Sequence, residues 1–96
     1  MALRFFIDPE TELPHIYGHN VSEVEVGDVL RDPLEDRAGT DETRVAVGKT
    51  RAGRYLRVIY KHDDFGFGDD VFIITAYDLP PRQFKALRRR LRRRLP

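Results

Sequence analysis

The sequence predicts a small α+β domain in which N-terminal helices and a C-terminal amphipathic helix pack on a twisted antiparallel sheet of about four strands. Three observations support this fold class. The chain has 96 residues, enough for one hydrophobic core but too few for two, so residues 1–96 are expected to form a single domain. Runs between residues 44 and 77 have the alternation or the β-branched content of strands. After Pro81 the apolar residues change to helical spacing.

The first twenty residues predict a short strand and a short helix. Residues 3–7 are mostly apolar or aromatic, and Asp8-Pro9 ends the run, which is typical of a strand. Residues 15–20 follow as a short helical segment. The apolar run is too short for a signal peptide or a spanning helix, so we expect a cytoplasmic protein that does not enter the membrane. The chain has no cysteine, which excludes a disulfide framework and a thiolate nucleophile.

A second helix and a loop are expected next. Ser22 followed three residues later by Glu25 is the signature of a capping box, so a helix begins here. The helix ends at Asp32-Pro33, because the residue before a proline disfavours the helical conformation. Residues 32–42 are rich in acidic residues, proline and glycine and predict a loop.

The middle of the chain predicts three strands. Residues 44–50 and 54–61 are expected to pair as an antiparallel hairpin through the turn at residues 50–53. Residues 71–77 are rich in β-branched side chains and form the most probable central strand. In the second strand, alternate side chains share a face. One face therefore carries Leu56, Val58 and Tyr60, and the other carries Tyr55, Arg57, Ile59 and Lys61.

The C-terminal segment predicts a basic amphipathic helix over residues 81–95. Phe84, Leu87, Leu91 and Leu95 are spaced by three, four and four residues and form one apolar stripe. Six arginines lie between residues 88 and 94. Such a stripe is expected to pack on the sheet, with the arginines toward solvent.

Charge is distributed in bands along the chain. Residues 1–81 carry nine of the 17 basic residues and all 16 acidic residues, whereas residues 82–96 carry eight basic residues and no acid. The overall formal charge of +1 hides this asymmetry. A basic band attracts polyanions through its local charge, so binding of a nucleic acid and neutralisation of the acidic first half are both open interpretations.

A second basic band, residues 44–62, has six basic residues and no acid. Together with nearby tyrosines and His62 it contains donors for phosphate, rings for base stacking and a group that titrates near neutrality. Such groups can cleave RNA without a metal, by deprotonating its 2′-hydroxyl, stabilising the phosphorane and protonating the leaving oxygen. A charged outer face of a half-buried sheet explains the same pattern. The basic residues are Arg44, Lys49, Arg51, Arg54, Arg57 and Lys61.

Two further motifs favour structural interpretations. His15 and His19 lie four residues apart, but no HExxH pattern accompanies them, so we expect packed or hydrogen-bonded histidines and no metal. Residues 63–70 contain four aspartates without the spacing of an EF-hand, which favours a solvated loop over a calcium site. Phe65 and Phe67 within it either pack back onto the core or mark a contact patch, and packing is the favoured expectation. No cofactor is predicted.

The order of motifs resembles the BrnT-like toxins of the wider RelE-type superfamily, and the uncharacterised domains grouped with them, over nearly the whole chain. The resemblance implies a compact α+β domain, a ribonuclease toxin acting on free or ribosome-bound mRNA, and an antitoxin of the ribbon-helix-helix type. The matching motifs are an aromatic first strand ending in Asp8-Pro9, His15-Ile-x-x-His19-x-Val21, Val29-Leu30-x-Asp32-Pro33, Arg44 to Gly48 with Thr50, Gly53-Arg54-x-Leu56-x-Val58-x-Tyr60, and Ile73-Ile74-Thr75-Ala76-Tyr77.

The chain departs from the family at two arginines. One usually follows the strand matching residues 58–60, where this chain has Lys61-His62-Asp63, and the other follows the dipeptide matching Thr75-Ala76, where it has Tyr77. We therefore expect a toxin-like endoribonuclease in which Lys61, His62 and Tyr77 are catalytic. The residues expected to bind nucleic acid are Lys49, Arg51, Arg54, Arg57, Arg88, Arg89 and Arg92.

Two alternatives remain open at this stage. The chain could be an inactive module with a toxin-like fold that holds nucleic acid or a protein partner through its arginine-rich tail. Alternatively, the C-terminal helix could serve oligomerisation or antitoxin docking through Phe84, Leu87 and Leu91, with the arginines keeping it dissolved. The oligomeric state is left open.

Overall fold

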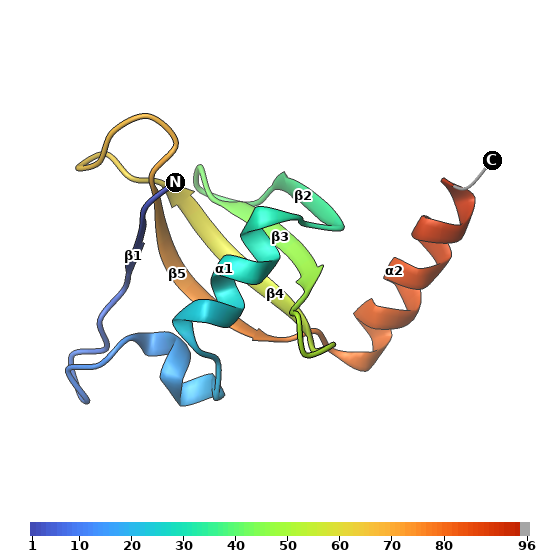
Figure 1. Cartoon of the computed structure of the whole chain (residues 1–96), viewed down its shortest axis with the longest axis horizontal. Helices are drawn as coiled ribbons and strands as arrows, with labels where there is room; N and C mark the ends of the chain where they lie inside the picture. Colours follow the sequence, from blue (N-terminus) through green and yellow to red (C-terminus); the bar gives the residue numbers. More distant parts are fainter. Residues whose placement is uncertain (95–96) are drawn as a thin grey trace.

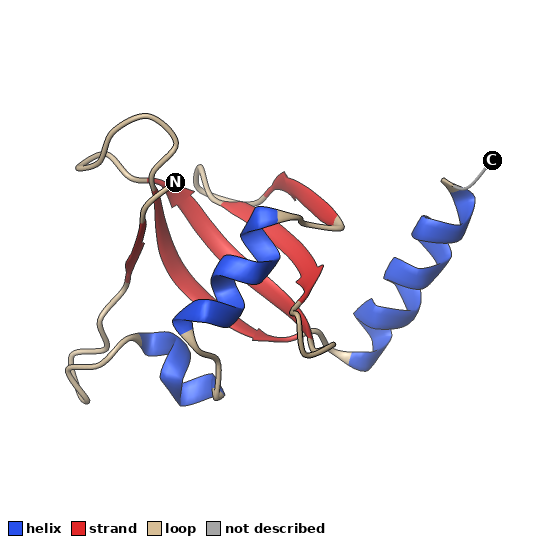
Figure 2. Cartoon of the chain, viewed as in Figure 1, coloured by secondary structure: helices blue, strands red, loops and turns tan. Residues whose placement is uncertain are grey.

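The computed structural model describes residues 1–94 and contains one five-stranded sheet with the order β1-β5-β4-β3-β2. Helix α1 crosses one face of the sheet, and helix α2 lies at the side away from β1 (Figures 1 and 2). The predicted position of Leu95 in the helix lies outside the described residues. The elements are β1 (Leu3–Phe5), the 3-10 helix η1 (His15–His19), α1 (Glu23–Arg31), β2 (Glu35–Ala38), β3 (Arg44–Lys49), β4 (Tyr55–His62), β5 (Val71–Asp78) and α2 (Pro81–Arg93).

The α+β class is confirmed, but the sheet differs from the prediction in two ways. β1 runs parallel to β5, with Phe5 opposite Ile73, so the sheet is mixed rather than antiparallel. β5 is an interior strand as expected, although β4 is the central one. The fifth strand, β2, lies inside the segment predicted as a loop and pairs with β3. Its sequence, Glu-Asp-Arg-Ala, has neither alternation nor β-branched residues, so pairing rather than local preference makes it a strand.

The first core lies between α1 and the sheet. The predicted capping box is present, because the Ser22 hydroxyl accepts a hydrogen bond from the Glu25 amide at 3.1 Å and the Glu25 carboxylate accepts one from the Ser22 amide at 3.0 Å. Gly48 allows α1 to approach β3, since a Cβ there would lie 3.0 Å from the Val29 side chain. The buried residues of this core include Val26, Val29, Leu56, Val58, Ile73 and Ala76.

The second core forms where α2 packs against β3 and β4 on the opposite face of the sheet. Leu87 is 1% exposed and packs with Val45, Val47 and Leu79. Phe84 is half-buried and meets the ring of Tyr55 edge-on, with centroids 4.8 Å apart. The two faces predicted for β4 are therefore both used, one in each core. The apolar stripe of α2 packs on the chain's own sheet.

An ion pair fixes the far end of α2 to β2. Both oxygens of the Glu35 carboxylate accept hydrogen bonds from Arg90, at 2.6 and 2.7 Å, and Arg94 lies 3.5 Å away. The Glu35 side chain is only 6% exposed. The hydrogen bond from Arg90 holds the pKa of this carboxyl below its ordinary value. Glu35 is an unusual residue to bury in a strand. Arg90, which lies 55 residues further along the chain, stabilises its burial.

The loop between β4 and β5 corrects one expectation. Phe65 and Phe67 are each 88% exposed and do not pack on the core. The loop's aspartates explain the difference, because Asp63 accepts hydrogen bonds from Arg4 and from the Phe65 amide, and Asp70 accepts one from the Phe67 amide. These turns fix the backbone and direct both rings outward. Within residues 1–94, no helix has both the length and the apolar character needed to cross a bilayer.

Tyr60 gives the first testable prediction. Its buried hydroxyl donates to Asp36, and burial together with this bond raises its pKa to about 12. A raised tyrosine pKa means that the protonated form stabilises the fold. This stabilisation is complete below the ordinary value of 10.0 and is lost as the pH rises through about 12. It amounts to roughly 2–3 kcal/mol, since one pKa unit corresponds to about 1.4 kcal/mol.

Alkaline absorbance titration measures this effect. One of the four tyrosines is expected to ionise near pH 12, together with unfolding, and a Tyr60→Phe variant should lack that late phase. Ionisation of all the tyrosines in one step near pH 10 would contradict the assignment.

Candidate nucleic-acid interface

Several cations of the band at residues 44–62 are paired with carboxylates. Three of its six basic residues lie within 4 Å of acidic side chains, most of which come from the first half of the chain. Such pairing lowers the positive potential that a polyanion would meet. The band therefore does not form a continuous phosphate-binding surface. The pairs are Arg44 with Asp36 (2.8 Å), Arg51 with Asp28 (3.8 Å), and Arg54 with Asp78 (2.6 Å) and Glu25 (3.2 Å).

Arg54 connects η1 to the end of β5. Its guanidinium donates to Asp78 and also to the backbone carbonyls of His19 at 3.3 Å and Asn20 at 2.7 Å. The hydrogen bond from Arg54 lowers the pKa of Asp78 below its ordinary range. Arg54 was predicted to bind nucleic acid, but its donors are engaged within the protein. It positions His19 beside β5.

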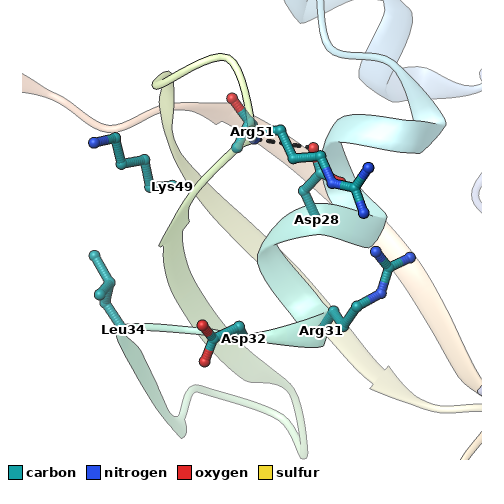
Figure 3. Close-up of a pocket in the computed structure, with 7 residues that line it drawn as sticks. Asp28, Arg31, Asp32, Leu34, Lys49 and Arg51 are labelled. Carbon is teal, nitrogen blue, oxygen red and sulfur yellow. Dashed lines mark hydrogen bonds and ion pairs between the residues drawn. The ribbon is translucent and has the colours of Figure 1, made fainter.

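Lys49 and Arg51 lie at a hollow of mixed charge between α1 and β3 (Figure 3). Arg51 is held by Asp28 through its backbone amide at 3.1 Å as well as its side chain. Lys49 points away from this pair in the figure, and its ammonium lies 5.7 Å from the centre of the Tyr55 ring. Arg31 and the carboxylates of Asp28 and Asp32 line the same hollow, so two of its three positive charges are offset.

The three predicted catalytic residues are not brought together. Lys61 and His62 end β4, opposite Phe72 and Val71 at the start of β5. Tyr77 lies near the other end of β5, roughly 17 Å from Phe72 at about 3.3 Å per residue. The ammonium of Lys61 instead lies 5.9 Å from the centre of the Phe72 ring. No single substrate atom can be within reach of all three residues.

Tyr77 lies instead between Arg57 and His19. Arg57 is the cross-strand neighbour of Tyr77, and its Nη1 donates to the phenol oxygen at 3.1 Å. The His19 ring lies edge-on to the Tyr77 ring, with centroids 5.8 Å apart. His15 packs in turn against His19 at 5.3 Å, and its Nδ1 lies 3.6 Å from Asp8. We call Arg57, Tyr77 and His19 the sheet-edge cluster.

From the sequence we expected His15 and His19 to be packed or hydrogen-bonded, and we did not place them beside Tyr77. No local pattern could have done so, because the sequence predicts a strand over residues 3–7 and the structure ends it at Phe5. A parallel β1 that ends at Phe5, opposite Ile73, leaves the second half of β5 open to the segment that follows. That segment is η1, which packs against β5.

The hydrogen bond between Arg57 and Tyr77 determines what the phenol can do. A guanidinium has no acceptor, so the phenol oxygen accepts and its own proton remains available to another group. Two buried polar atoms on the same face, Arg57 Nε and Thr75 Oγ1, have no hydrogen-bond partner among the described residues. An exposed imidazole, a phenol proton and a guanidinium thus lie together. No three His, Cys, Asp or Glu side chains in residues 1–94 are grouped to hold a metal ion.

Helix α2 carries a second set of cations. Their spacing of three, one and three residues places them on one helical face, where they line a shallow surface hollow. Within residues 1–94, none of them forms an ion pair with a carboxylate, in contrast to Arg90 and Arg94. We call this set the outer face of α2. It consists of Lys85, Arg88, Arg89 and Arg92.

Comparisons of the chain with protein-family models, with curated proteins and with solved structures found no match. The structure supports a small α+β domain with a five-stranded mixed sheet.

Proposed function

We propose that this domain is a toxin-like endoribonuclease that cleaves RNA by acid–base chemistry at the sheet-edge cluster. The observation that carries the proposal is the contact of Tyr77 with both Arg57, at 3.1 Å, and the ring of His19, at 5.8 Å between centroids. Cleavage of RNA by its own 2′-hydroxyl needs a proton acceptor, a proton donor and a positive group near the phosphate. The cluster supplies one residue for each role.

The proposed reaction is a transesterification within the RNA chain. His19 takes the proton of the 2′-hydroxyl, and the 2′-oxygen forms a bond to the adjacent phosphorus. Arg57 stabilises the charge of the phosphorane. The bond from phosphorus to the 5′-oxygen then breaks, and Tyr77 donates its proton to this leaving oxygen. The products are a 2′,3′-cyclic phosphate and a 5′-hydroxyl end.

The resemblance to BrnT-like toxins gives this proposal its biological setting. The substrate would be RNA in the cytoplasm, including mRNA on the ribosome, and the partner would be an antitoxin of the ribbon-helix-helix type. The order of elements supports the resemblance, since an aromatic first strand, two short helices and a β3-β4-β5 meander follow one another as expected. In this setting the family's second arginine position is taken by Tyr77.

A second candidate function is an inactive module that binds nucleic acid. The outer face of α2 favours it, because its cations are exposed, line a surface hollow and are not part of the sheet-edge cluster. Such a module would bind RNA but leave it intact, and its expression would not arrest growth.

Cleavage of a labelled RNA by the purified chain tests the proposed function and locates its site. We expect products with cyclic phosphate ends, and we expect His19→Ala to slow cleavage about 100-fold, the usual contribution of a general base. The matched control is His62→Ala, which removes an exposed imidazole at the far end of β4 and should leave the rate unchanged.

Two outcomes would contradict the proposal. Loss of cleavage in His62→Ala or Lys61→Ala, with full activity in His19→Ala, would move the site to the end of β4. Intact RNA after incubation with the unaltered chain, both alone and with ribosomes, would favour the inactive module.

A further inference from the structure

We infer that the outer face of α2 is a binding site for the phosphate backbone of RNA, used without regard to base sequence. The site consists of Lys85, Arg88, Arg89 and Arg92 and is separate from the sheet-edge cluster. The inference rests on the proposed function only for the choice of RNA as the polyanion. The binding chemistry is argued from α2 itself.

The packing of α2 determines which cations face solvent. Leu87 is buried, and Phe84 and Leu91 are half-buried against the sheet. The opposite side of the helix therefore points outward, and the four residues of the outer face are all exposed. Lys85 and Arg92 are seven steps apart, which at about 1.5 Å a step is roughly 10 Å along the helix axis. This length suits several consecutive phosphates rather than a single small anion.

Ion pairing separates the arginines of α2 into two groups. Arg90 and Arg94 turn toward β2 and hold the buried Glu35 carboxylate. The outer-face residues have no carboxylate within 4 Å among residues 1–94, so their positive potential is not offset locally. Arginines in this state bind phosphate oxygens through paired N–H groups. The inner arginines anchor the helix and the outer ones are available to a ligand.

The outer face also lies close along the chain to the sheet-edge cluster. Only Asp78, Leu79 and Pro80 separate Tyr77 from the start of α2. Arg57 and Tyr55 share one face of β4, and Tyr55 packs against Phe84 of α2. The cluster and the helix therefore lie toward the same side of the sheet. An RNA strand held on α2 has a short path to Tyr77.

The composition of the site determines its specificity. The guanidinium and ammonium groups of the outer face suit phosphates, and none of its four side chains has a ring or an amide to read bases. The nearby Phe84 ring lies 5.8 Å from the Arg88 guanidinium and is already packed against Tyr55. Binding should therefore be independent of sequence and strongly dependent on salt.

The test measures the affinity of the full chain for a short fluorescent single-stranded RNA over a series of salt concentrations. The variant K85Q/R88Q/R89Q/R92Q removes the outer face and keeps good helix formers. The matched control R31Q/R37Q/R82Q/R93Q removes the same number of exposed charges outside that face. We expect the first variant to flatten the plot of log affinity against log salt by about 0.7 per residue, or about 3 in total, and the control to change it by less than about 1.

A conservative variant, R88K/R89K/R92K, should keep most of the slope because the charges remain. Equal slopes for the outer-face variant and its control would overturn the inference, as would tighter binding of polyglutamate than of RNA, which would indicate an acidic protein ligand. Single-stranded DNA of the same length should bind comparably, because the site contacts phosphates and not the 2′-hydroxyl, and failure of that DNA to bind would overturn a site for backbone phosphates.

The same samples separate this inference from the proposed function. RNA that binds through α2 but stays intact keeps the inference and removes the ribonuclease. If the RNA is cleaved and the outer-face variant has an unchanged salt slope, the ribonuclease is kept and the binding site on α2 is removed.

Discussion

Replacing Tyr77 with phenylalanine is expected to slow RNA cleavage by about 100- to 1000-fold while changing RNA affinity less than about twofold. The substitution removes only the hydroxyl, which accepts from Arg57 at 3.1 Å and is proposed to protonate the leaving oxygen. Loss of a general acid typically costs about 10²- to 10⁴-fold in rate. Binding should persist because the outer face of α2 is untouched.

Single-turnover cleavage measures the chemical step directly. The control is Tyr17→Phe. Its exposed hydroxyl lies on η1, two residues before His19, but bonds to Glu23 at 3.0 Å, so its loss should leave the rate unchanged. An RNA with a good leaving group at the 5′-oxygen should restore most of the rate to the Tyr77 variant, because such a group leaves without a proton. Equal rates for Tyr77→Phe and the unaltered chain would remove Tyr77 from the chemistry.

Replacing Leu87 with aspartate is expected to destabilise the fold by about 4 kcal/mol and to release α2 from the sheet. Leu87 is 1% exposed, so the substitution both deletes its apolar contacts and places a carboxylate in the second core. Urea denaturation measures the loss, and amide exchange should show α2 opening before the sheet. Val24→Asp, at a highly exposed position of α1, is the control and should cost less than about 0.5 kcal/mol.

Light scattering distinguishes the two uses of the apolar stripe. The structure leads us to expect a mass that is unchanged or increased in the Leu87→Asp variant, because the second face of the sheet becomes uncovered. A smaller mass than that of the unaltered chain would instead place Leu87 in an interface between subunits.

Local patterns predicted most of the fold. The capping box, the alternation of β4 and the stripe of α2 are each complete within a few residues, so each was visible in the sequence and is present in the structure. β2 was missed because its strand character depends on pairing with β3 and on the contact between Glu35 and Arg90, 55 residues away. The parallel direction of β1 likewise depends on a distant partner.

The candidate site was harder to predict for the same reason. Composition pointed to arginine, tyrosine and histidine, and Tyr77 and Arg57 were both named. Their grouping with His19 depends on η1 packing beside β5, and the engagement of Arg54 depends on Glu25 and Asp78, which lie 29 and 24 residues away. Charge along the sequence gives no information about which cations an acidic neighbour will neutralise.

The two borders of the sheet have a consequence for how the protein behaves at high concentration. An unprotected border can recruit a strand from another molecule and start aggregation. On one side η1 continues where β1 stops and shields the rest of β5, while on the other side β2 is only four residues long and exposes Asp36 and Arg37. The short 3-10 turn that carries the imidazoles therefore also protects the molecule against edge-to-edge association.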